Sequence, residues 1–148
     1  MQGTINLHCT PIEEVKSFCY LGNHNITQDN KYPTEIKRRI ALAKQAFTKK
    51  QNLLTSRHLS IKIRKLFIKM YVWSVASYDS ETWTLSTLDK RRMEALEMWT
   101  WRKMMKISWR ERKSNIEVLN MIEEPRKIIK MMEIRKAKYF GHIMRHNT

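Results

Sequence analysis

The sequence predicts a mainly α-helical fold that begins with a short β-hairpin, and three observations lead to this prediction. Glycine and proline are scarce, with three of each in 148 residues, so few turns and long helices are expected. From about residue 34 onward, apolar residues recur at the spacing of one helix face. Alternating β-type runs are confined to the first 30 residues. With 42% hydrophobic and 29% charged residues, the chain is expected to be globular rather than disordered.

The formal net charge of +15 is distributed unevenly along the chain. Residues 1–30 contain one cation against three acids, residues 31–69 contain twelve cations against one acid, and residues 70–148 contain sixteen against ten. Each step in this balance is a candidate boundary. A cationic surplus of this size makes a polyanion the expected partner, with nucleic acid ahead of a membrane surface.

The first segment reads as short strands. Thr4–Cys9 alternates between apolar and polar residues until Pro11 interrupts it, and Val15–Tyr20 forms a second run. Gly22 and Asn23 supply a turn, after which Ile26–Thr27 is a candidate returning strand. Two or three strands alone are marginally stable in water, so this piece is expected to need a packing partner.

The second segment reads as two basic helices. Thr34 is a candidate cap for a helix to about Leu54, and Ser60 for the next. In the first helix the expected core stripe is Ile36, Ile40, Ala43, Phe47 and Leu54. In the second helix the residues expected to face inward are Ile63, Leu66, Phe67 and Met70.

The cations of these two helices are expected to share an outer surface once the apolar faces pack together. A face that only keeps a helical bundle in solution normally mixes acids with bases, and almost no acid is interspersed here. Phosphate contact is therefore preferred over a merely solvated face. The predicted nucleic-acid-binding residues are Lys37, Arg38, Lys44, Lys49, Lys62, Lys65 and Lys69.

Three further helices are expected beyond a junction at Tyr71–Leu85, whose large aromatic rings suit a core corner. Ser86 opens a helix to about Ile107, and Ser114 with Glu117 forms a capping box for a short helix to about Ile122. A last basic helix follows Pro125. Secondary phosphate candidates in this part, where acids are mixed among the bases, are Arg102, Lys103, Lys106, Arg135, Lys136 and Lys138.

Several short motifs, in the same order along the chain, resemble motifs of the reverse transcriptases of non-LTR (LINE-type) retrotransposons. Tyr78–Trp83 resembles the Tyr-Gly-Ser-Glu-Thr-Trp segment of that family, with Asp79 in place of glycine. Phe18–Gly22 is similar to the primer-grip hairpin, with Tyr20, Leu21 and Gly22 at the matching positions. Matches to the thumb motif Glu-Ile-x-x-Arg-Ile-x-x-Ala are Glu35, Ile36, Arg39, Ile40 and Ala43. Later matches are Leu96–Trp99, Arg102, Ile107–Trp109, Lys138–His142, Arg145 and His146.

This resemblance implies a C-terminal fragment of such an enzyme. The implied parts are the end of the palm with the primer grip at 1–30, a thumb-like helical pair at 31–82 and a post-thumb helical segment at 83–148. The parent family is an RNA-directed DNA polymerase that uses Mg²⁺ held by paired aspartates. This chain has three separated aspartates, so its expected role is not catalysis but binding of the backbone of RNA, DNA or an RNA–DNA hybrid. The missing palm and fingers are an expected partner.

Other interpretations stay open. A free-standing or domesticated basic helical nucleic-acid-binding protein has the same composition. A basic amphipathic protein on a membrane surface also fits the apolar stripes. His8, Cys9, Cys19 and His24 lack the spacing of a zinc knuckle, and His142 with His146 is half a site, so no metal or cofactor is predicted.

The cellular setting is expected to be soluble, reducing and intracellular, either nuclear or cytoplasmic. Two cysteines do not make a disulfide framework, and no secretory signal opens the chain. The longest apolar run is far shorter than the ~20 residues of a spanning helix, so no membrane insertion is expected. Neither cysteine has an indicated base and orienting group beside it, so no nucleophilic catalysis is predicted.

Overall fold

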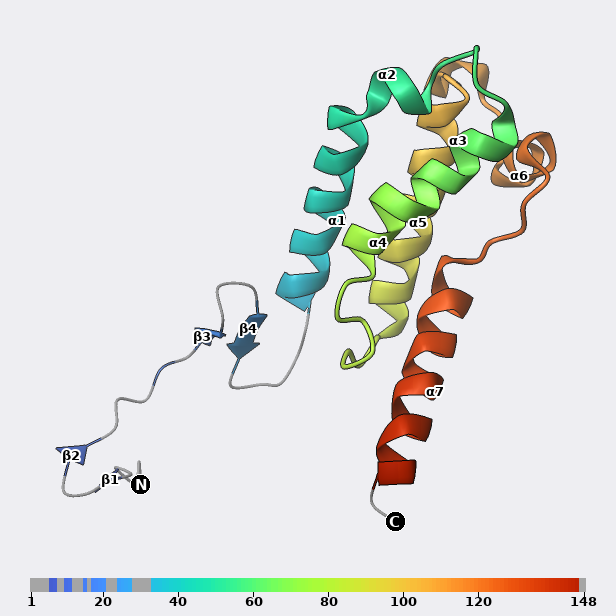
Figure 1. Cartoon of the computed structure of the whole chain (residues 1–148). Helices are drawn as coiled ribbons and strands as arrows, with labels where there is room; N and C mark the ends of the chain where they lie inside the picture. Colours follow the sequence, from blue (N-terminus) through green and yellow to red (C-terminus); the bar gives the residue numbers. More distant parts are fainter. Residues whose placement is uncertain are drawn as a thin grey trace.

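The described part of the protein is mainly α-helical, as the sequence predicts (Figure 1). The structure is a computed structural model, and it describes residues 6–7, 10–11, 15, 17–20, 24–27 and 33–146. In the first segment, β1 (Asn6–Leu7) pairs antiparallel with β2 (Thr10–Pro11). β3 (Ser17–Tyr20) pairs antiparallel with β4 (His24–Thr27), with Tyr20 opposite His24. Leu21 and Gly22 lie outside the described residues.

Helix α1 (Pro33–Lys49) and the short helix α2 (Gln51–Leu54) confirm the first basic helix, with a break at Lys50. The predicted cap at Thr34 is wrong, because α1 begins at Pro33 and Thr34 lies inside the helix. The predicted apolar stripe faces the core. Ile36, Ala43, Phe47 and Leu54 are buried, and Ile40 packs against them. A helix whose apolar residues recur every three or four positions must bury that face, which fixes the rotation of α1 about its axis.

The next helix runs through α3 (Ile61–Phe67), the π-helical turn η1 (Ile68–Trp73) and α4 (Ser74–Ala76). Ser60 caps it by accepting a hydrogen bond from the Ile63 N–H, as predicted. The π-helical turn shifts the side-chain register, so that Ile68, Val72, Trp73 and Ala76 are all buried.

The predicted inward face of α3 is wrong. Leu66 and Met70 are both 55% exposed and Ile63 is exposed, and Phe67 alone of the four packs against the core. The opposite face is buried, where Arg64 donates to the Met104 carbonyl at 3.2 Å and Lys65 to the Ile122 carbonyl at 2.8 Å. Both carbonyls lie at helix C-termini, which lack intrahelical donors and favour cations. The long aliphatic stems of Arg64 and Lys65 supply the packing surface that the apolar residues were expected to supply.

Helix α5 (Thr87–Met104), the 3₁₀ turn η2 (Trp109–Glu111) and α6 (Asn115–Ile122) begin at serine caps. Ser86 with Asp89 and Ser114 with Glu117 form reciprocal capping boxes, which confirms both predicted starts. A third box, Ser108 with Glu111, opens η2.

Helix α7 (Ile128–His146) is the predicted last basic helix. Glu97, which is fully buried on α5, accepts hydrogen bonds from the N–H groups of Lys127 at 2.9 Å and Ile128 at 3.4 Å. A carboxylate at this position satisfies unpaired N–H groups and complements the helix dipole. Burial raises the pKa of Glu97, and these two N–H groups work against that rise. Two of the apolar residues that mark this helix in the sequence, Phe140 and Ile143, are exposed.

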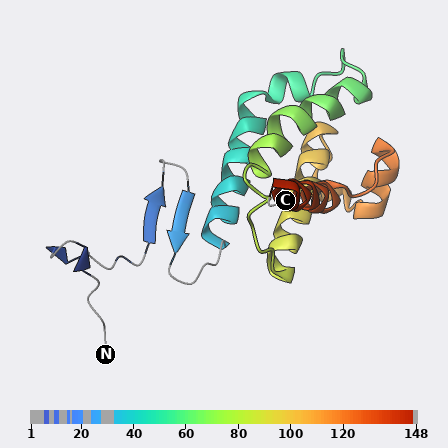
Figure 2. The ribbon, with the colours of Figure 1, turned by 60° about the horizontal axis from the view of Figure 1, so that its bottom comes forward.

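The helices surround one hydrophobic core, with α5 between α1 and α7 (Figure 1). Figure 2 views α7 almost end-on and shows it beside α5. At the aromatic junction, Trp73 and Trp83 are buried, whereas Tyr71 and Tyr78 are exposed. The Trp73 ring meets the Trp101 ring edge-on at 5.4 Å between centroids. The predicted boundary at residue 82 stays a prediction, and the core extends across it. Across the described residues, the helices are each too short or too polar to cross a bilayer.

Candidate nucleic-acid interface

The four predicted cations on α1 lie in two rows rather than one. Successive residues of a helix are turned by about 100°, so Lys37 and Lys44 share one row while Arg38 and Lys49 share another about 120° away. Lys37 and Lys44 are exposed, and the Lys44 Nζ lies 5.4 Å from the centroid of the Trp99 ring on α5. Lys44 therefore lies on the flank of α1 that faces Trp99, and Lys37 lies two turns earlier in the same row.

The second row differs in its neighbours. Arg38 pairs with Glu35 at 3.3 Å, and Glu35 is itself buried against Arg39 at 2.7 Å. Lys49 is exposed, and within residues 33–146 no acid pairs with it. The Arg38–Glu35 contact reduces the charge that this row presents to solvent.

The predicted cations of α3 have different roles from one another. Lys62 is exposed, as expected for a phosphate contact. Lys65 and Lys69 instead turn toward the loop after α6, where both pair with Glu124, at 3.6 Å and 2.9 Å. Lys127 pairs with the same carboxylate at 2.8 Å. Two of the seven residues predicted to contact phosphate thus form ion pairs that link α3 and η1 to the end of α6.

The Glu124 cluster has an electrostatic consequence. Burial alone would raise the pKa of Glu124, but hydrogen bonds and charge from Lys127 and Lys69 outweigh it and lower the pKa to about 2. Glu124 therefore stays ionised at any ordinary pH, and it compensates three cations at once.

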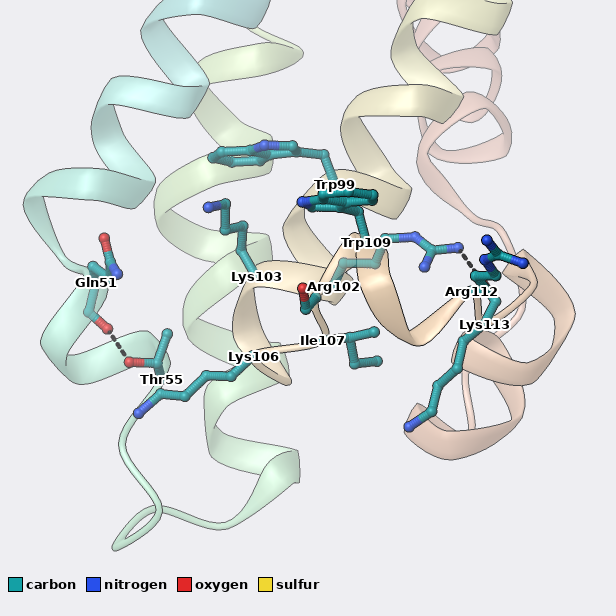
Figure 3. A pocket seen from close by; sticks show the side chains of 11 residues that line it. Gln51, Thr55, Trp99, Arg102, Lys103, Lys106, Ile107, Trp109, Arg112 and Lys113 are labelled. Carbon is teal, nitrogen blue, oxygen red and sulfur yellow. Dashed lines mark hydrogen bonds between the residues drawn. The ribbon is translucent and has the colours of Figure 1, made fainter.

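A cavity of about 680 Å³ lies where α2, the C-terminal part of α5 and the 106–113 segment meet (Figure 3). Its lining contains five cations and no acid. We refer to it as the tryptophan pocket, because two indole rings line it. The lining residues are Gln51, Thr55, Trp99, Arg102, Lys103, Lys106, Ile107, Ser108, Trp109, Arg112 and Lys113.

The five cations of the tryptophan pocket are not equivalent. Arg102 is held by the Lys113 carbonyl at 2.9 Å and by Asn115 Oδ1 at 2.8 Å, and Lys113 pairs with Glu111 at 3.1 Å. The side chains of Lys103, Lys106 and Arg112 have no hydrogen-bond or ion-pair partner within the described residues. Three side chains of one sign thus line one cavity without compensation.

Two of these uncompensated cations stand on strained backbone. Lys106 has φ of 57° and Arg112 has φ of 49°, both in the left-handed region. That region costs L-residues free energy and is usually given to glycine. Between them, the Ser108–Glu111 capping box fixes the 3₁₀ turn that carries Trp109. A hydrogen bond from the Ser108 N–H, with help from Lys113, lowers the pKa of Glu111 and so keeps this box ionised.

The α1 row and the tryptophan pocket are contiguous. Gln51, at the start of α2 just beyond the break that ends α1, lines the pocket. Trp99 joins the two, since its ring lies beneath Lys44, packs edge-on against Phe47 at 5.3 Å and forms part of the pocket wall. We call the surface that Lys37, Lys44, Lys103, Lys106 and Arg112 border the basic surface; the pocket lining within it holds no acid, and the neighbouring Glu111 pairs with Lys113.

Lys103 and Lys106 are among the secondary candidates predicted from the sequence, but Arg112 and Trp109, which line the same pocket, are not. The signal that was available is local: a serine–glutamate capping box directly encloses a tryptophan, and arginines flank it at 110 and 112. A capped turn of this kind fixes the backbone that carries the enclosed side chain.

The residues considered for a primer grip or a metal site lie apart from the basic surface in the sequence. The primer-grip-like Tyr20 lies in β3, and its Leu21 and Gly22 lie outside the described residues. His142 and His146 are adjacent on α7, with ring centroids 4.6 Å apart. Among the described residues, no three histidines, cysteines or acids gather closely enough to hold a metal ion. His8 and Cys9, of the zinc grouping considered above, lie outside that part.

Comparison of the chain with protein-family models, with curated protein sequences and with solved structures finds no match.

Proposed function

We propose that this protein binds the sugar–phosphate backbone of a nucleic-acid duplex, and that the basic surface makes the contact. The observation that carries the proposal is that α1 places no acid in the row of Lys37 and Lys44, and that the lining of the adjoining pocket holds none. Elsewhere in the described part, many cations are neutralised in place, as around Glu124 and Glu35. Cations left without counter-charges on a rigid helix suit phosphate oxygens, whose negative charge replaces the missing acids.

The resemblance to non-LTR reverse transcriptases gives this proposal its context. We propose that the chain is a fragment of such an enzyme, comprising the primer-grip, thumb and post-thumb parts, and that duplex binding is what it retains. The left-handed backbone of Asp79, with φ of 61°, supports the comparison because the family has glycine there. No catalytic step is assigned to these helices. An RNA–DNA hybrid, with its A-like shape, is the expected ligand.

The experiment compares two double variants with equal loss of charge. Lys37→Gln/Lys44→Gln removes the row beside Trp99, and Arg38→Gln/Lys49→Gln removes the other row. Binding of a fluorescent RNA–DNA hybrid, duplex RNA and duplex DNA is measured side by side by anisotropy at fixed ionic strength. The first variant is expected to lose at least about tenfold in affinity, and the second much less, since a phosphate contact acts only at short range.

Equal losses in the two variants would show a response to net charge alone and would contradict the assigned surface. Circular dichroism and thermal unfolding check that both variants keep their helices. Anionic lipid vesicles at the same ionic strength test the membrane-surface alternative, and preferential binding to vesicles would overturn the proposal.

The second candidate function, a free-standing nucleic-acid-binding protein, rests on the same basic surface. It differs in origin rather than in contacts, so the binding experiment does not separate the two. The genomic reading frame upstream does: an encoded aspartate-pair hairpin favours the fragment, and a dedicated promoter and exon favour a retained gene.

A further inference from the structure

Trp109 is the most exposed large apolar side chain in the described part of the protein, with 84% of its surface accessible. Three of the other four tryptophans are buried, namely Trp73, Trp83 and Trp101, and Trp99 is half-buried. An indole held in water forgoes the free energy of burial, which is large for so big a ring. A ring that stays outside although a core is available is therefore suited to a ligand.

The local structure holds Trp109 in this exposed position. The Ser108–Glu111 capping box fixes the turn, with the Ser108 N–H 3.0 Å from Glu111 Oε1. Left-handed residues, Lys106 and Arg112, bound the turn on both sides. Strained backbone of this kind persists where the surrounding structure over-determines it, and it clusters at binding sites.

The cavity beside Trp109 combines aromatic walls with uncompensated cations. Figure 3 shows the rings of Trp99 and Trp109 at one end of the tryptophan pocket, with the side chains of Lys103 and Lys106 reaching along it. Ile107 adds apolar surface, and Arg112 adds a third cation without a partner. The volume of about 680 Å³ falls within the range of small-molecule sites.

We propose that the tryptophan pocket binds an unpaired nucleotide of a single strand, with the base stacked on Trp109 and the neighbouring phosphates on Lys103, Lys106 and Arg112. Stacking on an aromatic ring together with cations along the backbone is the general chemistry of single-strand binding. A base within a duplex is covered on both faces by its neighbours and cannot reach the ring. The inference extends the proposed function, and rests on it in that the same basic surface carries both: Lys37 and Lys44 contact duplex while the pocket receives a single-stranded end.

The contiguity of the two parts supports this division. Trp99 lies under Lys44 on its α1 side and forms the pocket wall on the other. A strand that leaves a duplex lying along α1 would pass Lys44 and Trp99 before it enters the pocket. Both RNA and DNA offer this chemistry, so the experiment includes each.

The test uses the full chain and eight-nucleotide single strands of uridine and of thymidine, with an abasic strand of the same length as the backbone-only probe. The variants are Trp109→Ala, Trp109→Phe and, as a control at another exposed aromatic residue, Tyr139→Ala on α7. Trp109→Ala is expected to weaken binding of both base-bearing strands by about five- to a hundredfold. Trp109→Phe is expected to retain most of the affinity, and Tyr139→Ala all of it. The abasic strand is expected to bind wild type and Trp109→Ala alike.

Unchanged binding of the base-bearing strands by Trp109→Ala would overturn the pocket assignment, as would an equal loss for the abasic strand. Because Trp109 is exposed, Trp109→Ala is expected to unfold at the wild-type temperature. Anionic vesicles form a further arm: a blue shift of Trp109 fluorescence with vesicles and none with the strands would also overturn it.

The failures of the two proposals are distinguishable. If duplex binds through Lys37 and Lys44 while single strands ignore Trp109, the pocket inference alone fails. If single strands bind through Trp109 while duplex affinity is unaffected by Lys37→Gln/Lys44→Gln, the duplex proposal alone fails. If the wild-type protein shows no salt-sensitive binding to any of the nucleic acids, both proposals fail.

Discussion

Within the described residues, four that are not glycine have left-handed backbone, namely Asp79, Lys106, Arg112 and Glu123, in a chain whose sequence has three glycines. Three of these follow or end a helical turn, where glycine is the usual solution. Lys106 and Arg112 adopt this unfavourable backbone conformation beside the tryptophan pocket. Glu123, with φ of 52°, has no such role and ends α6 with a negative charge near the negative end of the helix dipole.

Replacing Glu123 with glycine should therefore stabilise the protein. We expect Glu123→Gly to raise the free energy of unfolding by about 0.5–1 kcal/mol through relief of the left-handed strain. Urea denaturation measures the change. Glu123→Gln is the matched control, since it removes the charge and keeps the strain. A glycine variant no more stable than the glutamine variant would contradict the strain argument.

Glu124 should make stability depend on pH in acid. Its pKa of about 2 in the folded protein lies below its ordinary value of 4.5, so the unfolded chain binds a proton first as the pH falls. The stabilisation from its ion pairs is fully present above about pH 4.5 and is lost as the pH falls from there through about 2. Its size is on the order of 3 kcal/mol.

The measurement is the free energy of unfolding of wild type and Glu124→Gln between pH 2 and pH 7. The variant should be less stable at pH 7 and should approach wild type at the acid end. A constant difference across the range would show that the ion pairs with Lys69 and Lys127 do not set this dependence. Glu97, whose pKa shift has the opposite sign, is present in both proteins and cancels in the comparison.

At the scale of elements, the three serine-capped helix starts were predictable, whereas the start of α1 and the rotation of α3 were not. The hydroxyls of Ser60, Ser86 and Ser114 each accept a hydrogen bond from the N–H three residues further on, so each cap is encoded by a short stretch of sequence. The buried face of α3 is set by carbonyls 40 and 57 residues away, those of Met104 and Ile122. Nothing in the periodicity of residues 61–70 encodes these partners, and the apolar stripe pointed to the opposite face.

The placement of the candidate site was predictable in part for the same reason. Lys37 and Lys44 were predicted to be exposed because the α1 stripe is regular. Their separation from Arg38 and Lys49 follows from helical geometry alone. The tryptophan pocket was not foreseen, because it needs α2 and the 106–113 segment to meet in space.

Helix α7 should depend on its buried cap. We expect Glu97→Ala to lower the free energy of unfolding by about 2 kcal/mol, since the N–H groups of Lys127 and Ile128 lose their acceptor inside the protein. Glu97→Gln keeps one acceptor oxygen and should lose less. Hydrogen exchange of the α7 amides locates the effect, and an Ala variant with unchanged protection along α7 would contradict it.

On the scale of the whole molecule, the formal charge of +15 is less informative than its arrangement. Some cations, such as Lys65 and Lys69, hold elements together, and others, such as Arg39, pair inside the fold. The cations that remain around Trp99 have no counter-charges and repel one another, and a bound polyanion relieves that repulsion. That self-repulsion is the physical basis of the proposed function.

The salt dependence of hybrid binding tests this account most directly. Association constants for an RNA–DNA hybrid are measured from low to moderate salt for wild type, Lys37→Gln/Lys44→Gln and Arg38→Gln/Lys49→Gln. Each lost phosphate contact flattens the slope of log K against log salt by roughly 0.9. The account predicts a slope flatter by about 1.8 for the first variant and nearly the wild-type slope for the second. Identical slopes for the two variants would contradict it.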